Sequence, residues 1–330
     1  MYEPVLPPNV PMPLDQELLA WAAGFFDGEG STIARAYSRR PDYFQLEVSV
    51  PQSGPSGEPE VLRKFQMSML GVGKIYPQHR DAMYKWSACG RIGSELTLAL
   101  MWPWLGEVKR AQAATAAAIV ASSYESGRFR RGRARQTPTF VPHSARETGS
   151  SEESRCELSW AAGFLDGEGY FGLPKEYERS DASTGYVVRA SATQHSADTS
   201  PPAVLLRLQK ALGIGRIECH GKEDDFKWVT EGPFSVRLVL ESTRTWLGSV
   251  KTMQAETALA FASAHRIRGD AERCVRGHLY DRIDISPDGR IHRRCNTCER
   301  INNRERRAAL GAKPRRLKNP SPDPSRIYAA

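Results

Sequence analysis

The chain has 330 residues, of which 40% are hydrophobic and 25% charged, as expected for a globular protein with two or three domains. No apolar run approaches the roughly 18 residues of a membrane-spanning helix. The proline-rich start also lacks the basic and apolar regions of a secretory signal. These features exclude a membrane or secreted protein and predict a cytosolic one.

The net charge of +8 is unevenly distributed. Residues 266–318 hold 16 lysines and arginines against 7 acidic residues, and the run GRFRRGRARQ (127–136) holds five arginines. Basic segments of this kind either bind nucleic acid or are simply solvated. Three cysteines (Cys89, Cys156 and Cys219) are isolated, and we interpret them as small buried or incidental thiols. The other three cluster near His278, and no disulfide framework is predicted.

The first predicted helix ends in the decapeptide WAAGFFDGEG (21–30). Its small residues Ala22, Ala23 and Gly24 predict close packing against another helix. Gly28 and Gly30 are expected to end the helix, because glycine tolerates the conformations found at helix termini. Glu29 stands between them.

The remainder of this half predicts two strands, a helix, two strands and two helices. In FQLEVSVPQ (44–52), apolar and polar residues alternate with the period of a strand that buries one face. The glycines of LGVGKIY (70–76) mark a turn from helix to strand, and YKWSACG (84–90) is the next strand. WLGEVKRAQA (104–113) begins a helical tail.

A second half repeats this order at offsets of 139 to 142 residues. Its segments are WAAGFLDGEG (160–169), YVVRASATQ (186–194), LGIGRIE (212–218), FKWVTEG (226–232) and WLGSVKTMQA (246–255). Each half is therefore predicted to be one structural unit. We expect an N-terminal extension at 1–13, the first repeat at 14–125, a basic and polar linker at 126–154, and the second repeat at 155–265.

The duplicated acidic tips predict a metal site. If the two motif helices pack as a pseudo-symmetric pair, Glu29 and Glu168 lie side by side and repel each other unless divalent cations lie between them. Carboxylate oxygens suit Mg²⁺ that also binds substrate phosphates, and such ions promote phosphodiester cleavage. The alternative is an acidic turn after an amphipathic helix, which the near-identical repetition disfavours.

The two decapeptides resemble the motifs of the LAGLIDADG homing endonucleases, in the single-chain form with two motifs, over residues 14–264. The resemblance implies an α+β fold of two pseudo-symmetric αββαββα repeats, whose two four-stranded sheets form a saddle over double-stranded DNA. It implies a monomer acting as a pseudo-dimer. It also implies Mg²⁺- or Mn²⁺-dependent cleavage of both strands across the minor groove, leaving short 3′ overhangs. Alanine and phenylalanine replace the usual leucines of the motif, a tolerated apolar variation.

The resemblance also assigns roles to residues. It makes Glu29 and Glu168 the metal-binding catalytic carboxylates, and Asp27 and Asp166 structural residues at the helix ends. The family's other polar and basic site positions match Gln52, Gln194, Lys109 and Lys251. The glutamines would order the attacking water, and the lysines would offset charge on the scissile phosphates. A solvated surface position is the alternative for each lysine.

Base recognition is expected from polar side chains on the sheet faces. The candidates are Arg35, Arg39, Gln45, Lys74 and Lys85 in the first half, and Arg189, Arg216 and Lys227 in the second. For each of them, a plain surface charge is the competing interpretation.

Residues 270–310 are expected to form a small zinc-ribbon-like module. Cys274, His278, Cys295 and Cys298 follow the spacing C-x3-H and C-x2-C, which suits a closed, structural Zn²⁺ site. SPDGR (286–290) predicts a turn between two short strands, and ERINNRERRAAL (299–310) a basic helix. The module is similar to small zinc modules attached to phage and bacterial endonucleases. There, Arg293, Arg294, Arg300 and Arg304 would contact DNA phosphates. The basic tail 311–330 is expected to be disordered.

Several alternatives stay open. The module itself could be an HNH nuclease using His278, His292 and Asn302 or Asn303, although the metal requires His278. The whole chain could be an intron RNA-splicing maturase or a non-cleaving DNA-binding regulator. The terminal residues Met1 and IYAA lack the groups that protein splicing uses, so we expect a free-standing protein rather than one embedded in an intein. A mobile-element enzyme acting in a bacterial or phage-infected cytoplasm, at the nucleoid, is the leading hypothesis.

Overall fold

A computed structural model describes residues 13–37, 40–55, 57–78, 82–125, 150–178, 184–196, 200–219, 225–265 and 273–309. The chain divides into two compact units. The larger comprises Met1–Asp270 with Ile285–Ile291, and the smaller comprises Ala271–Asp284 with His292–Ala330. Within the described ranges, no helix is both long enough and apolar enough to cross a membrane. The predicted Arg39 lies outside the described residues.

The first half of the larger unit has the predicted order of elements. Its elements are α1 (Gln16–Glu29), β1 (Ser31–Tyr37), β2 (Arg40–Ser53), α2 (Glu60–Ser68), β3 (Lys74–Pro77), β4 (Met83–Cys89), α3 (Gly90–Met101) and α4 (Glu107–Glu125). The four strands form one sheet in the order β1-β2-β4-β3, with every neighbouring pair antiparallel.

The second half repeats the first. Its elements are α5 (Ser150–Glu168), β5 (Gly169–Glu178), β6 (Thr184–His195), α6 (Ala203–Leu212), β7 (Arg216–Cys219), β8 (Asp225–Glu231), α7 (Pro233–Thr243) and α8 (Ser249–Ala264). The sheet order is β5-β6-β8-β7, again antiparallel. The expected α+β architecture of two αββαββα repeats is confirmed. Because α5 begins at Ser150, the last residues of the expected linker are helical.

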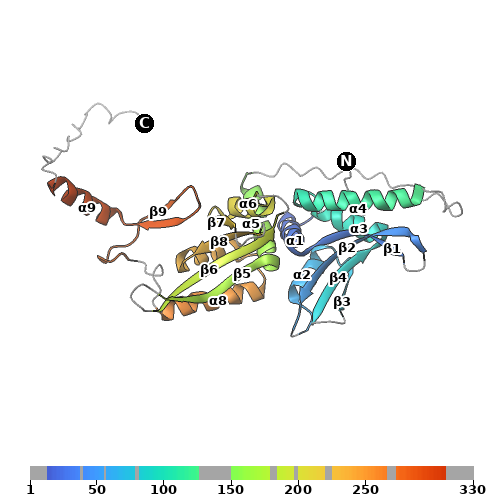
Figure 1. The fold of residues 1–330 in the computed structure, drawn as a ribbon, viewed down its shortest axis with the longest axis horizontal. Coiled ribbons are helices and arrows are strands. Elements are labelled where there is room, and N and C mark those ends of the chain that lie inside the picture. The colour runs from blue at the N-terminus through green and yellow to red at the C-terminus, as the bar shows by residue number, and fades with distance from the viewer. Residues whose placement is uncertain are drawn as a thin grey trace, which may run out of the picture. The chain divides into compact units, whose positions relative to one another are not determined.

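Each sheet buries one face, as the alternation in the sequence predicts. In β2, Leu46, Val48 and Val50 are buried. Val48 lies opposite Ala88 and Val50 opposite Trp86 of β4. Figure 1 shows α1 and α5 side by side between the two sheets. In the first half, α4 contacts β1 and β2, and in the second half α8 contacts β5 and β6.

The motif helix α1 is buried on all sides. Every residue from Leu19 to Phe26 is buried, and so are Trp160 to Leu165 in α5. A helix that is apolar all round is stable only inside a core, and here that core joins both halves. The Trp21 ring stacks on Phe25 at 5.5 Å between centroids, and Trp160 stacks on Phe164 at the same distance.

The two LGxG turns share one construction. Gly73 and Gly215 have φ values of +83° and +87°, and a Cβ on either would lie within 2.5 Å of a tryptophan ring, that of Trp86 or Trp228. Only glycine satisfies both constraints. Each tryptophan Nε1 donates to a backbone oxygen of the turn at 3.0 Å, so the turn is fixed to its own sheet.

The C-terminal elements are β9 (Arg282–Ile285), β10 (Ile291–Arg294) and α9 (Asn296–Ala309). They belong to the smaller unit except for Ile285 and Ile291, which are grouped with the larger one. β9 and β10 form a two-stranded sheet. The predicted SPDGR turn connects them, with Ser286 N–H donating to the Arg290 oxygen at 2.9 Å. The expected strand pair followed by a basic helix is therefore present.

Candidate active site

The motif helices α1 and α5 touch at their backbones. A Cβ on Gly24 would lie 1.9 Å from the carbonyl oxygen of Trp160, and a Cβ on Gly163 would lie 1.9 Å from that of Trp21. Such distances are far inside van der Waals contact, so the glycines are required by the approach of the two helices. The sequence-based expectation of closely packed motif helices is confirmed.

This packing brings the ends of the two motifs together across the interface. Glu29 is the last residue of α1, and its Cγ lies 2.9 Å from where a Cβ on Gly167 of the other helix would be. Glu168 ends α5 and packs in the same way against Gly28. The prediction that Gly28 ends the helix was wrong: α1 continues through Glu29, and Gly28 instead makes room for Glu168.

Both motif carboxyls have raised pKa values. Burial is the main cause for Glu29, and Lys251 and then Lys109 oppose it. For Glu168, burial and the negative charge of Glu29 together raise the pKa to about 7, against the effects of Gln194 and the two lysines. Each carboxyl also sits at a helix C-terminus, where the helix dipole adds negative potential. The site therefore concentrates negative charge.

The predicted lysines lie at this site. Lys109, in the first turn of α4, donates to the Gly30 oxygen at 2.5 Å, and Lys251 of α8 donates to the Gly169 oxygen at 2.5 Å. Burial lowers the pKa of both lysines, while the motif carboxylates act to raise it. Neither lysine is a freely solvated surface residue. Lys251 has the larger effect on Glu29, and Lys109 on Glu168.

Asp27 and Asp166 hold the helices that carry these lysines. Asp27 accepts from the Gly106 N–H at 3.0 Å, directly before α4. It also accepts from Trp160 Nε1 of the other half at 2.8 Å. Asp166 does the same with Gly248, directly before α8, and with Trp21 Nε1. Burial raises the pKa of each aspartate to about 6, against the bonds from its tryptophan and glycine donors.

The predicted glutamines, Gln52 and Gln194, lie close to the C-terminal ends of β2 and β6. Gln194 forms a side-chain hydrogen bond with Glu168, which favours the ionised form of that carboxyl. Gln52 is the equivalent residue beside Tyr84 in the first sheet. The prediction that both glutamines order water is not tested by these contacts.

The donor set fits a hard divalent cation. Two carboxylates on helix termini, one of which raises the pKa of the other, form a site that gains stability when positive charge enters it. In the described part of the chain, Lys251 and Lys109 are the cations that lower the pKa of Glu29, and they do not outweigh its burial. Glu29 and Glu168 are therefore the residues that would hold Mg²⁺ or Mn²⁺.

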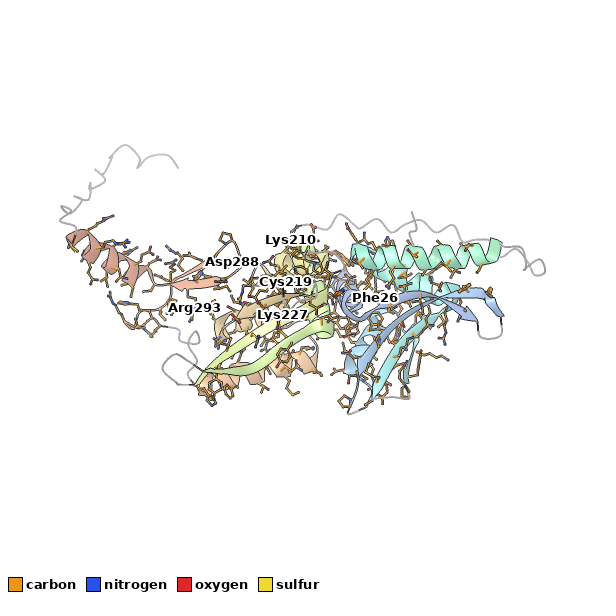
Figure 2. All side chains as sticks on the ribbon, in the orientation of Figure 1. Phe26, Lys210, Cys219, Lys227, Asp288 and Arg293 are labelled. Carbon is orange, nitrogen blue, oxygen red and sulfur yellow. The ribbon has the colours of Figure 1, made fainter. Side chains whose placement is uncertain are left out.

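The base-contact candidates share the polar faces of the two sheets. In strands, residues at alternate positions share a face, and the buried positions fix which face is the core. Opposite the core faces lie Arg35, Gln45, Lys74 and Lys85 in the first sheet, and Arg189, Arg216 and Lys227 in the second. Figure 2 labels Lys227 on β8.

On the polar face of the first sheet, the structure shows one further residue, Glu47, that the sequence did not predict as part of the site. The Glu47 side chain is only 1% exposed, and it accepts from Arg35 at 2.8 Å and from Lys85 at 2.7 Å. Burial alone raises its pKa, but Lys85 and Arg35 outweigh burial and the net shift is downward. Two predicted DNA contacts are thus oriented by a buried carboxylate. Only the alternation of β2, which places a glutamate among polar positions, pointed to it.

The second face carries a different arrangement of charge. Arg216 binds Glu218 at 2.5 Å and Glu231 at 3.1 Å. Arg189 occupies the position in β6 that Glu47 occupies in β2, since Arg189 pairs with Glu231 of β8 and Glu47 with Cys89 of β4. Burial and the neighbouring Arg189 lower the pKa of Lys227. The two sheet faces therefore differ in charge at equivalent positions.

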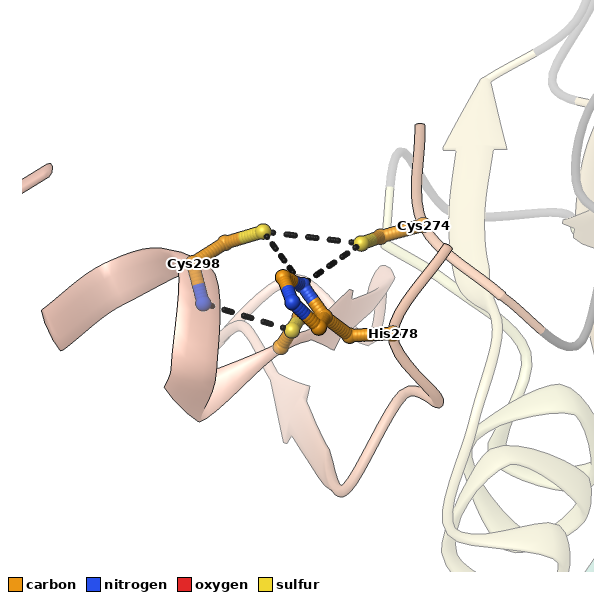
Figure 3. A group of neighbouring side chains, drawn as sticks. Cys274, His278 and Cys298 are labelled. Atoms are coloured by element: carbon orange, nitrogen blue, oxygen red, sulfur yellow. Dashed lines mark hydrogen bonds between the residues drawn. The ribbon is translucent and has the colours of Figure 1, made fainter. Parts of the chain in front are cut away.

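The four predicted zinc ligands converge in the smaller unit. One ligand atom from each of Cys274, His278, Cys295 and Cys298 lies within 4.8 Å of all the others. Sγ of Cys274 lies 3.6 Å from Nδ1 of His278 and 3.5 Å from Sγ of Cys298. Nδ1 of His278 and Sγ of Cys298 are 3.3 Å apart (Figure 3).

These distances fit a tetrahedral zinc site. Ligand atoms at the usual zinc distances lie about 3.3–3.8 Å apart. Desolvation opposes ionisation of Cys274, but the backbone N–H of Arg276 and the thiol of Cys298 lower its pKa to about 6. All four ligand positions belong to the protein, so the site is closed and suits a structural Zn²⁺. His278 lies in this cluster, and His292 is exposed on β10, which gives no support to the HNH alternative.

The predicted arginines of this unit lie on β10 and α9. Arg293 packs over the Tyr280 ring at 4.5 Å, and Arg294 pairs with Asp284 at 2.9 Å. Arg300 and Arg304 are exposed on α9, a helix without a buried residue. The last turn of α9 also carries Arg306 and Arg307, and a basic, exposed helix face of this kind is suited to an anionic partner.

Compared by sequence, the chain matches no protein-family model and no curated protein. Compared by structure, it resembles several DNA-bound endonucleases. The LAGLIDADG meganuclease I-AabMI bound to uncleaved DNA matches with a TM-score of 0.55 at 15% identity, covering 77% of this chain and 92% of that one. The I-LtrWI LAGLIDADG homing endonuclease bound to target DNA matches with a TM-score of 0.53 at 16% identity, covering 76% of this chain and 92% of that one. The I-SmaMI LAGLIDADG homing endonuclease bound to cleaved DNA matches with a TM-score of 0.50 at 17% identity, covering 78% of this chain and 92% of that one. The chain therefore has the fold of the LAGLIDADG homing endonucleases, in the single-chain form that carries both motif halves.

Proposed function

We propose that the protein is a site-specific, metal-dependent double-strand DNA endonuclease. One observation carries the proposal: the side chains of Glu29 and Glu168 each pack against a glycine of the opposite motif helix, Gly167 and Gly28, with the half-buried Lys109 and Lys251 beside them. Burying two carboxylates beside each other at helix ends is unfavourable without a cation. A purely structural interface would favour apolar residues at these two positions.

Different residues of the chain would bind the metal, orient the water and stabilise the phosphate charge. Glu29 and Glu168 would hold Mg²⁺ or Mn²⁺, which when bound activates water and stabilises the attacking and leaving oxygens of the phosphodiester. Gln194, bonded to Glu168, and its equivalent Gln52 would orient the attacking water. Lys109 and Lys251 are oriented by their bonds to Gly30 and Gly169, and would offset charge that develops on the scissile phosphates.

Two sites related by pseudo-symmetry suit the two strands of a duplex. Cleavage across the minor groove would leave short 3′ overhangs, with the polar faces of the two sheets in the major groove on either side. Because the two faces differ in charge at equivalent positions, such as Glu47 and Arg189, the recognised site would not be a palindrome. The zinc-bound module and its α9 arginines would add phosphate contacts that are sensitive to salt.

The proposal is tested with a plasmid library that carries randomised inserts. The full-length, zinc-loaded protein is incubated with the library in Mg²⁺, in Ca²⁺ or in EDTA, and the broken ends are sequenced. We expect breaks at one recurrent sequence in Mg²⁺ and none in EDTA. Glu29→Gln and Glu168→Gln should each abolish double-strand breaks, and Glu256→Gln, an exposed carboxylate paired with Arg244, should not.

Other outcomes would redirect the assignment. Sequence-specific binding without cleavage in any divalent metal would favour a DNA-binding regulator on the same fold. Binding to structured intron RNA in preference to duplex DNA would favour a maturase. Cleavage that survives both glutamine substitutions would remove these carboxylates from the active site.

A further inference from the structure

A half-buried cation in each half reaches across to the other half. Lys64 lies in α2 of the first half, with its Nζ 3.9 Å from the centroid of the Trp21 ring, and it donates to the backbone oxygen of Trp246 in the second half. Arg207 occupies the equivalent position in α6. Its guanidinium lies 4.0 Å from the Trp160 ring centroid, and it donates to the Trp104 oxygen of the first half at 2.6 Å.

Each cation binds a loop directly, and the tryptophan under it binds the aspartate that holds the same loop. Trp246 stands two residues before Gly248, whose N–H is held by Asp166, and Trp21 Nε1 donates to that same Asp166. The loop leads directly into α8 and its Lys251. In the other direction, Arg207 binds the Trp104 carbonyl, and Trp160 binds the Asp27 that holds Gly106 at the start of α4.

Ordinary core packing does not explain a cation at these positions. Burial lowers the pKa of Lys64 to about 8, so its charge is kept at a cost that a leucine or methionine over the Trp21 ring would avoid. Arg207 adds a bidentate ion pair with Glu157, at 2.7 and 2.9 Å. What the cations provide, and an apolar side chain would not, is a directed bond to one carbonyl in the opposite half.

We propose that Lys64 and Arg207 are positioning residues that act in trans, each fixing the loop of the opposite half that presents a site lysine. Lys64 fixes the loop before Lys251, and Arg207 fixes the loop before Lys109. The role in DNA cleavage rests on the proposed function, whereas the role in fixing the loops does not. The two halves thus complete each other's sites beyond the contact of α1 with α5.

The two loops are not held equally. The Trp246 indole also donates to Glu17 of α1 at 3.0 Å. The buried Trp104 Nε1 has no hydrogen-bond partner among the described residues. Ser249, at the start of α8, also donates to Glu60 of the first half at 2.6 Å, whereas the further bond to the loop before Lys109 comes from Arg110 of its own half, to the Pro103 oxygen at 3.1 Å. The loop before Lys109 therefore depends more on its cation for contact with the opposite half, and loss of Arg207 should have the larger effect.

Hydrogen–deuterium exchange of the full-length, zinc-loaded protein tests the proposal without DNA. In Lys64→Met, amides of residues 246–251 should exchange about tenfold faster or more, with residues 104–109 unchanged. Arg207→Met should do the reverse, with a larger change. Lys64→Arg should restore the wild-type rates. Arg63→Met and Lys210→Met remove exposed cations from the same two helices and should alter neither loop.

A second readout is cleavage of each strand of a target. Lys64→Met should slow one strand more than the other, and Arg207→Met should reverse the bias, with the affinity for DNA unchanged. Equal exchange changes in both loops, or none, would overturn the proposal, as would equal slowing of both strands. If the wild type cuts no DNA, the proposed function fails, and the exchange data still decide whether the cations position the loops.

Discussion

Gly24 packs against the backbone carbonyl of Trp160 so closely that a Cβ on Gly24 would lie 1.9 Å from that oxygen. The two halves of the protein meet at this contact and at its pseudo-symmetric counterpart between Gly163 and Trp21. Close approach of the helix backbones is what allows Glu29 and Glu168 to reach each other's helix. The distance between the helices is thus set by residues that take no part in chemistry.

Gly24→Ala should therefore be strongly destabilising. Because the obstacle is backbone on both sides, the added methyl group can be accommodated only by separating the helices, at a cost of about 3 kcal/mol or more. Urea unfolding followed by circular dichroism measures the change. The control is Gly93→Ala in α3, where the new Cβ would meet its nearest atoms at 3.7 Å. That substitution should stabilise the protein by about 0.5–1 kcal/mol, and equal losses in both variants would contradict the steric account.

Asp27→Ala should be costly for a different reason. Asp27 is the acceptor for two donors, Trp160 Nε1 and the Gly106 N–H, and alanine would leave both buried without a partner. The expected loss is about 3–5 kcal/mol in the free energy of unfolding. Asp15→Ala removes the exposed N-cap bond to Leu18 at the other end of α1, and should cost about 1 kcal/mol. A loss at Asp27 no larger than at Asp15 would show that the aspartate does not anchor α4.

Much of this arrangement was predictable because the chain carries two copies of it. The repeat of the motif, the sheet strands and the WLGxVK segments predicted two equivalent halves with Glu29 beside Glu168, and the resemblance to the LAGLIDADG family added Lys109 and Lys251 to the site. The alternation in β2 predicted which residues face away from the core. A local pattern of this kind predicts an element and its exposed face. The duplication adds the prediction that the two motif helices, α1 and α5, pack against each other.

The residues that were missed act through contacts between segments far apart in the chain. Lys64 and Arg207 bind backbone carbonyls 182 and 103 residues away, and a carbonyl has no sequence identity to search for. Glu47 resembles any polar residue on an exposed strand face until the positions of Arg35 and Lys85 are known. Gly28 was misassigned because a glycine near a helix end has two explanations, termination or close approach, and only the partner helix distinguishes them.

Glu47→Gln should reduce sequence discrimination more than affinity. The substitution removes the charge that holds Arg35 and Lys85 in one orientation, and both cations become free to follow phosphates. Binding to non-target duplex should strengthen at low salt, with a steeper dependence on salt, while discrimination should fall by about 1–3 kcal/mol for the base pairs that Arg35 would contact. Fluorescence anisotropy with target and scrambled duplexes measures both. Glu218→Gln, in the Arg216 ion pair, is the matched variant of the second sheet, and its effect should map to the other half-site.

Loss of zinc should affect DNA affinity and leave the larger unit folded. Cys295→Ser removes a buried ligand of the four-residue cluster, whereas Cys219→Ser removes an exposed thiol of β7. Native mass spectrometry should find one zinc ion in the wild type and in Cys219→Ser, and none in Cys295→Ser. The zinc-free variant should bind DNA more weakly, with a shallower salt dependence, because the arginines of α9 lose their fixed positions. An unchanged salt dependence would remove this module from the DNA interface.

Glu168→Gln should make the metal-free protein more stable while it abolishes cleavage. Burial and Glu29 raise the folded-state pKa of Glu168 from 4.5 to about 7, so the folded protein binds this proton more tightly than the unfolded chain does. The stabilising contribution of the proton is therefore fully present below pH 4.5 and is lost as the pH rises through about 7. Glutamine is neutral throughout and loses nothing over this range.

The difference in Tm between Glu168→Gln and the wild type, measured in EDTA, should consequently grow from about pH 5 to pH 8. Asp27 and Asp166 titrate in the same direction, but they are present in both proteins and cancel in the difference. Mg²⁺ should raise the Tm of the wild type at the higher pH and have little effect on the variant, since the cation replaces the proton only where a carboxylate can bind it. A wild type that is more stable than Glu168→Gln at high pH in EDTA would mean that the carboxylate is satisfied without a cation, and the metal site would have to be placed elsewhere.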